Sequence, residues 1–145
     1  MSFRFPLTSL LRVRESVEKR EETALQAIQS EISQLHRSIG DLNVEIAQGS
    51  RTLQASLQQP QEARQMQLTL REIERNVVLR RDLLLKLEVW QQKRKVQLKA
   101  YRAAARDRHV LSEMHAQKRA EYDQRQERAQ QKFLDDIFTS RSQSR

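Results

Sequence analysis

A ladder of apolar residues at heptad spacing runs up to one proline, Pro60, and resumes after it. The steps alternate between four and three residues, which gives a helix a narrow apolar seam that another helix must cover. Because proline cannot continue a helix, Pro60 divides the ladder into two halves. The sequence therefore predicts an all-α fold, a long antiparallel two-helix coiled-coil hairpin. The expected seam residues are Ile28, Ile32, Leu35, Ile39, Leu42 and Ile46 before the proline, and Ile73, Val77, Leu84 and Leu87 after it.

The bounds of this hairpin follow from its two prolines and its polar end. Pro6 suits a first helical turn, and we expect residues 1–145 to form one structural unit. The expected bounds are about 6–57 for helix one, about 58–61 for the turn, about 61–138 for helix two and 139–145 for a frayed polar tail. Facing residues would then have numbers that add to about 119, and the C-terminal helix would overhang by about twenty residues, roughly 30 Å.

Composition supports a thin pair of helices. Only 2 glycines and 2 prolines occur in 145 residues, and the chain is 37% hydrophobic and 32% charged, which is too polar for a thick globular core. The chain has no cysteine, so disulfides and thiolate metal sites are excluded and a reducing cytoplasm is favoured. No segment approaches the ~20 apolar residues of a membrane span. The first residues also lack the features of a secretory signal.

Apolar residues gather where the expected seam ends. The overhang of helix two carries Tyr122, Phe133 and Phe138 among others, and Phe3 and Leu10 of the N-terminal stretch lie toward the same end. Apolar groups without a partner in the seam predict a docking site. The alternative is that these groups fold on one another and cap the hairpin.

Charge is concentrated in the second half of the chain. The net charge is +8, although residues 1–60 hold equal numbers of acidic and basic side chains. The densest stretch, residues 86–108, holds eight basic and two acidic residues. Such a stripe fits phosphates or an acidic protein face, but it also fits a solvated helix face. Because no nucleic-acid-binding module accompanies it, a nucleic-acid-binding hairpin is the weaker alternative.

The sequence shows no set of residues at the spacing that catalysis or metal binding requires. His36, His109 and His115 are scattered rather than paired at metal-binding spacing. There is no glycine-rich phosphate loop and no arrangement of nucleophile and base. We therefore predict no enzyme activity, no catalytic or metal-binding residue and no cofactor. Trp90 suits either a partner-binding anchor or a seam position.

The two ends of the chain resemble the FliJ family of flagellar type III export proteins. The opening Phe3-Arg-Phe-Pro-Leu-Thr-Ser-Leu-Leu-Arg-Val-Arg is similar to that family's aromatic–basic–aromatic start with paired leucines and an arginine. The closing Lys132-Phe-Leu-Asp-Asp-Ile is similar to its leucine–acid–acid–apolar motif. The length and the central turn match too, so the resemblance covers nearly the whole chain.

The resemblance implies a function in flagellar protein export without catalysis. Family members are two-helix stalks that enter the hexameric export ATPase ring and promote its assembly and activity. They also contact the cytoplasmic region of the export-gate membrane protein and bind export chaperones. The implied location is the cytoplasm, peripherally at the inner face of the cell membrane. The residues that match, and would contact the ATPase, are Phe3, Phe5, Leu7, Leu10, Leu11, Arg12, Arg14, Leu134, Asp135, Asp136 and Ile137.

Two other classes of protein share these features. One is a generic coiled-coil adaptor that associates through the overhang. The other is the stalk of a virulence-type secretion system, which has the same architecture.

Overall fold

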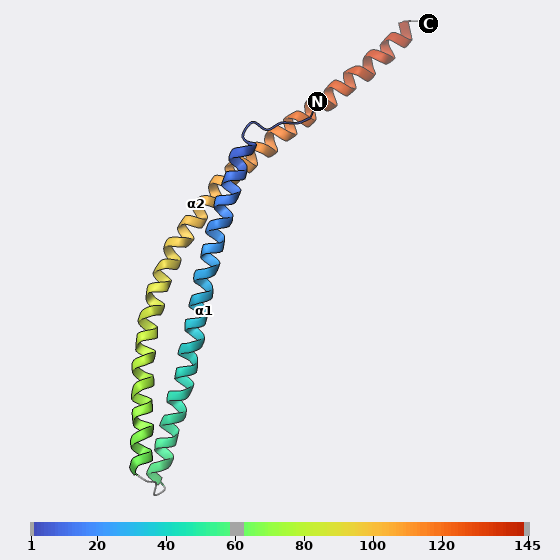
Figure 1. Ribbon diagram of the computed structural model, residues 1–145. Coiled ribbons are helices and arrows are strands. Elements are labelled where there is room, and N and C mark those ends of the chain that lie inside the picture. Colours follow the sequence, from blue (N-terminus) through green and yellow to red (C-terminus); the bar gives the residue numbers. More distant parts are fainter. Residues whose placement is uncertain (1, 59–62, 144–145) are drawn as a thin grey trace. The chain divides into compact units, whose positions relative to one another are not determined.

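The computed structural model describes residues 2–58 and 63–143, and nearly all of them are helical. Helix α1 spans Thr8–Gln58 (51 residues) and helix α2 spans Ala63–Gln143 (81 residues). They pack against each other as a hairpin, and residues 2–58 and 63–143 contain no strand (Figure 1). The predicted all-α coiled-coil hairpin is therefore confirmed. Pro60 and most of the predicted turn lie outside the described residues.

Helix ends differ from the expected bounds by a few residues. Helix α1 begins at Thr8 rather than Pro6, because the backbone N–H and the Oγ1 of Thr8 both donate to the Phe5 carbonyl, at 3.2 and 2.6 Å. Helix α2 is described as far as Gln143, five residues past the expected end at residue 138. The Thr139 hydroxyl donates to the Asp135 carbonyl at 2.6 Å, a bond from a side chain back to the helix backbone four residues earlier.

The chain divides into two compact units. The hairpin unit is Glu21–Tyr101, and the terminal unit combines Met1–Arg20 with Arg102–Arg145. Each unit contains a part of α1 and a part of α2.

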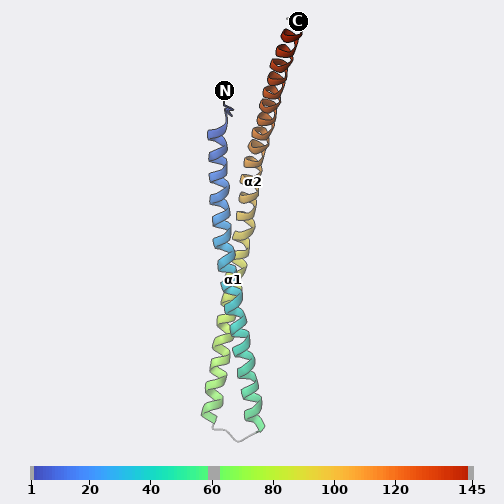
Figure 2. The ribbon, with the colours of Figure 1, turned by 90° about the vertical axis from the view of Figure 1, so that its right-hand side faces the viewer.

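The core of the hairpin unit is a narrow aliphatic seam between its antiparallel helices (Figures 1 and 2). Leu35, Ile39 and Leu87 are buried together, and partly buried hydrophobic residues pack against them. Fully burying one such side chain contributes roughly 1.5–3 kcal/mol. The expected seam of α1 is formed, with Leu42 also buried and Ile28, Ile32 and Ile46 half-buried.

Helix α2 turns only part of the expected stripe toward α1: Leu87 is buried and Ile73 is half-buried in the seam, as predicted. Val77 and Leu84 were expected in the seam, but they are 39% and 46% exposed. Asn76, only 4% exposed, and Leu83 take the corresponding places. The run Leu83-Leu-Leu offers two apolar stripes one residue apart, and choosing Leu83 also brings Trp90 against the core. Trp90 is thus a half-buried seam residue.

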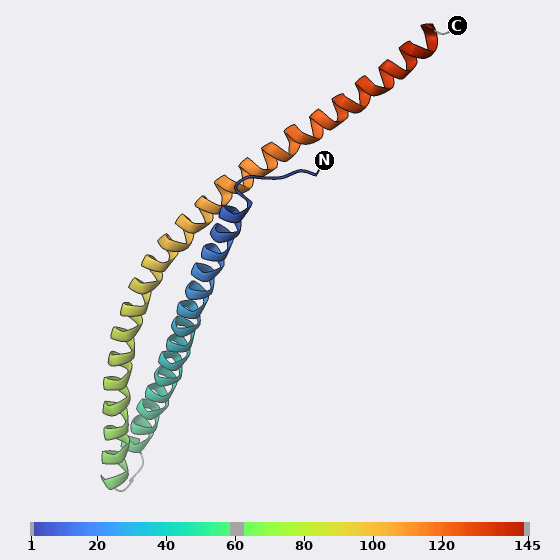
Figure 3. The ribbon, with the colours of Figure 1, turned by 45° about the horizontal axis from the view of Figure 1, so that its top comes forward.

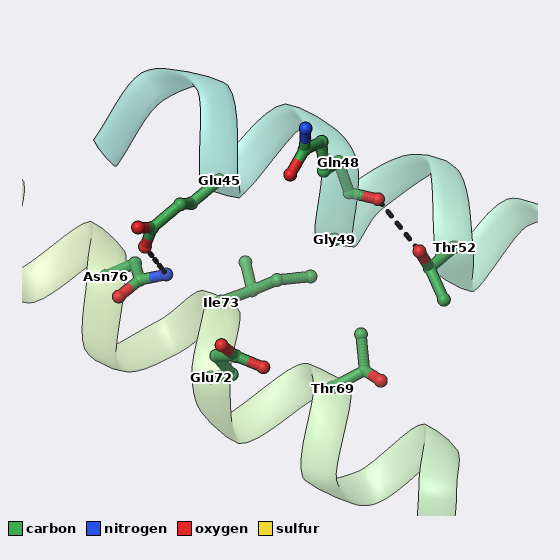
Figure 4. A pocket seen from close by; sticks show the side chains of 8 residues that line it. All are labelled: Glu45, Gln48, Gly49, Thr52, Thr69, Glu72, Ile73 and Asn76. Atoms are coloured by element: carbon green, nitrogen blue, oxygen red, sulfur yellow. Dashed lines mark hydrogen bonds between the residues drawn. The ribbon is translucent and has the colours of Figure 1, made fainter. Parts of the chain in front are cut away.

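The pairing of the two helices is shifted by three residues from the expected one. Ile73 faces Gly49 instead of Ile46: a Cβ placed on Gly49 would lie 2.8 Å from Cγ1 of Ile73. The next layer is polar, because the Asn76 side-chain amide donates to the Glu45 carboxylate at 3.2 Å. Figure 4 shows both layers. Glycine at position 49 therefore allows a close approach of the helices at Ile73.

The terminal unit is packed with fewer aliphatic residues. Its buried hydrophobic residues are Phe5, Ala104 and Leu111. Arg108 of α2 forms a two-pronged ion pair with Glu18 of α1, with Nε and Nη2 donating to the two carboxylate oxygens at 2.6 and 3.3 Å. Residues 2–5, which precede α1, extend alongside α2 (Figure 3).

Candidate partner-binding surfaces

The N-terminal aromatic residues of the expected docking site pack inside the terminal unit. Phe5 is buried, and its ring meets the His115 ring edge-on with 5.0 Å between centroids. Phe3 is half-buried between His115 and Tyr122, at 5.5 and 5.6 Å, and the Arg119 guanidinium lies 5.3 Å from its ring centroid. These contacts match the alternative in which the terminal apolar groups fold on one another.

The leucines and arginines that follow are only partly covered. Leu7 and Leu11 are half-buried, whereas Leu10 is 41% exposed and Arg12 is exposed. Arg14 pairs with Asp107 of α2 through a 3.3 Å contact on the surface. Leu10 and Arg12 are thus accessible at the start of α1.

The C-terminal residues of the expected site are much more exposed. Phe133, Leu134 and Phe138 are 65%, 52% and 67% exposed, and Ile137 is half-buried. Their spacing places these four residues, the C-terminal apolar face, on one side of α2. Asp135 and Asp136 are exposed and lie on the other side by the same helical geometry. This is an amphipathic helix end with its apolar side accessible.

The two expected halves of the docking site are not brought together. Phe3 makes its ring contact at Tyr122, and Leu134 lies twelve residues further along α2, about 18 Å of helix. We had expected one surface made from both ends of the chain. The structure instead shows a packed N-terminal part and a separate C-terminal apolar face.

Part of the basic stretch 86–108 is engaged within the protein. Arg108 pairs with Glu18, and the Lys93 ammonium lies 4.3 Å from the centroid of the Trp90 ring. The pair of Glu18 and Arg108 depends on which turn of α2 faces α1, so the sequence did not predict it. The contact of Lys93 with Trp90 joins residues three apart on one helix, and that spacing could have indicated it. The other six basic residues of the stretch are exposed.

The histidines at positions 109 and 115 lie in different surroundings. His109 contacts Glu113 at 3.1 Å on the surface, and His115 lies among aromatic rings. Residues 2–58 and 63–143 contain no group of three possible metal-binding side chains. A polar cavity of about 260 Å³ lies beside Gly49 and Ile73, lined in part by Glu45, Glu72 and Asn76 (Figure 4).

Neither described helix has an apolar stretch long enough to cross a bilayer. No family model, curated protein or solved structure matches this chain.

Proposed function

We propose that this protein acts as a coiled-coil stalk that docks onto a partner through the C-terminal apolar face of α2. The observation that carries the proposal is the exposure of Phe133, Leu134 and Phe138 on one side of a helix. Large aromatic and aliphatic side chains exposed together are typical of binding surfaces, where they supply most of the binding energy. The role is one of contact rather than catalysis.

The resemblance to the FliJ family supports a particular partner. The closing motif Lys132–Ile137 overlaps the C-terminal apolar face, so the proposed partner is the hexameric export ATPase of a flagellar export apparatus. Docking in the centre of the ring would promote its assembly and activity. Contacts with the export-gate membrane protein and with export chaperones belong to the same proposal. So does a peripheral position at the inner face of the cell membrane.

The packing of the N-terminal residues sharpens the proposed contact. Phe3 and Phe5 contact α2 within this chain, so they are assigned a supporting role. Leu10 and Arg12 remain accessible and are assigned to the edge of the contact. Asp135 and Asp136 would then orient the partner through charge.

The test is ATP hydrolysis by the export-type ATPase of the same organism, titrated with this protein. The variant Leu134→Ala/Ile137→Ala/Phe138→Ala should keep its helicity and lose stimulation. Because Leu134 and Phe138 are more than half exposed and Ile137 is not fully buried, their loss should leave the fold intact. A matched control is Val13→Ala/Val44→Ala, which removes exposed apolar groups of α1 and should stimulate as the native protein does.

Several outcomes separate the competing functions. Stimulation that survives the triple substitution contradicts the proposed site, and the replacement of Leu10 and Leu11 by alanine then tests the other end. Absence of both binding and stimulation contradicts the export function and leaves a generic coiled-coil adaptor. Stimulation of the ATPase of an injection system alone would identify a virulence-type stalk.

A further inference from the structure

Helix α2 carries a second apolar strip that α1 does not cover. In the hairpin unit Val77, Val78, Leu84 and Leu85 are all exposed, by 39% to 57%. They recur at intervals of one and seven residues, which places them on one side of the helix. A helix that is apolar on two sides needs a second partner, because one neighbouring helix covers only one side.

A line of alternating charges runs along the middle of this strip. Glu74, Arg81, Glu88 and Lys95 follow one another at seven-residue intervals, and all four are exposed. Along the helix these four charges are negative, positive, negative and positive. Arg81 lies 3.5 Å from Asp82 in a pair with both side chains more than half exposed, and such surface pairs contribute little. The line is therefore available to another molecule.

We propose that this strip binds a second copy of the chain, with the two α2 helices antiparallel about a two-fold axis between Leu84 and Leu85. In this register Arg81 faces Glu88 of the second copy, and Glu74 faces its Lys95. By symmetry each pair forms twice, so all four charges are matched. The proposal uses a different face from the C-terminal apolar face and does not rest on the proposed function.

Charge decides the direction of the two helices. A parallel pair in register would place Glu74 against Glu74 and Arg81 against Arg81, which is repulsive. A parallel pair staggered by seven residues matches opposite charges, but it leaves an open end that adds further copies. Only the antiparallel arrangement both matches the charges and closes.

The same register gives the contact an apolar centre and a charged edge. Leu84 and Leu85 meet their counterparts at the axis, and the charged pairs lie to either side of them. Protein interfaces usually have this anatomy. The distance from Glu74 to Lys95 corresponds to about 30 Å of helix.

The first experiment exchanges charges and measures the dimer dissociation constant by sedimentation equilibrium. Arg81→Glu places two acidic residues against each other at both sites and should weaken the dimer at least about tenfold. Arg81→Glu/Glu88→Arg should restore the native constant, because every facing pair is again opposite in sign. In the staggered parallel arrangement the same double substitution would set Glu74 against a glutamate, so no restoration would occur.

The second experiment maps orientation by crosslinking, which is direct because the native chain has no cysteine. Leu85→Cys should form a covalent dimer under mild oxidation or with a short bis-maleimide, since it lies next to the axis. Glu74→Cys should not, because its own counterpart lies about 30 Å away along the helix. A mixture of Glu74→Cys and Lys95→Cys should crosslink. Val44→Cys, on the exposed side of α1, is the control for random collision.

Three results would overturn the proposal. The first is a monomer at every soluble concentration. The second is efficient crosslinking of Glu74→Cys with itself, which would indicate a parallel pair. The third is a dimer that Arg81→Glu leaves unchanged. Circular dichroism of each variant excludes loss of the helices as a cause.

Discussion

In the hairpin unit the contact between α1 and α2 is made by aliphatic layers, with Leu35, Ile39 and Leu87 buried together. In the terminal unit ion pairs link α1 to α2, the segment before α1 packs aromatic rings on α2, and Phe5, Ala104 and Leu111 are buried. The stability that apolar layers contribute depends on the amount of surface area they remove from water. Rings and ion pairs depend on geometry and on salt. The two units of one hairpin should therefore respond to different perturbations.

The largest effect should come from shortening a seam side chain in the hairpin unit. Leu87→Ala should lower the free energy of unfolding by about 2–3 kcal/mol, because it leaves a cavity next to Leu35. Urea denaturation followed by circular dichroism measures this loss. Leu68→Ala is a matched control on the same helix, and since Leu68 is more than half exposed it should change stability by less than ~0.5 kcal/mol. Equal losses in the two variants would contradict the seam described for α2.

The terminal unit should be destabilised by lengthening a buried side chain rather than by shortening one. Ala104 is buried there, so Ala104→Leu should lower the free energy of unfolding by about 1–3 kcal/mol through overpacking. Ala116 is exposed on the same helix, and Ala116→Leu should be close to neutral. A stabilised Ala104→Leu variant would show that an aliphatic layer fits in this unit as well.

A smaller effect should come from the ion pair between Glu18 and Arg108. Glu18→Gln should cost about 1 kcal/mol, because it weakens a two-pronged contact that is mostly shielded from water. Asp107→Asn removes the charge of the more exposed pair with Arg14 and should cost less than that. Repeating both measurements in high salt should reduce the difference. A larger loss for Asp107→Asn would contradict this ranking.

The two helical glycines offer the finest comparison. No atom lies within 4 Å of a Cβ placed on Gly40, so Gly40→Ala should raise the free energy of unfolding by about 0.5–1 kcal/mol. At Gly49 the new methyl group would require Ile73 to move, so the gain should be smaller or absent. Thermal denaturation of both variants measures the difference. An equal gain at both positions would show that Ile73 shifts without penalty.

The heptad periodicity of the sequence was sufficient to predict the fold and the buried side of α1. It was not sufficient to predict which side of α2 faces α1. In α1 a single apolar stripe exists, so Leu35, Ile39 and Leu42 were found directly. In α2 the leucines at 83–85 fit two stripes, and periodicity cannot rank them. The choice depends on three-dimensional contacts, among them Trp90 against the core and Ile73 against Gly49.

Only part of the candidate docking site could be predicted from the sequence, because here too the rest depends on three-dimensional contacts. The exposed C-terminal residues lie where the apolar pattern continues beyond the expected partner helix. The packing of Phe3 and Phe5 on α2 could not be foreseen, because it depends on a short segment folding back before α1 begins. Composition alone does not distinguish an aromatic residue that docks on a partner from one that packs within its own chain.

The separation in sequence between contacting residues has a kinetic consequence. Asn76 and Glu45 are 31 residues apart, whereas Arg14 and Asp107 are 93 apart. Closing the longer loop without the shorter one costs about 1 kcal/mol more in chain entropy. The hairpin should therefore close progressively from the pair at 45 and 76 toward the chain ends, and pulsed hydrogen exchange should show protection spreading in that order. Until that closure is complete, the aromatic contacts of Phe3 and Phe5 stay open, and a nascent chain exposes these rings for longer than any seam residue.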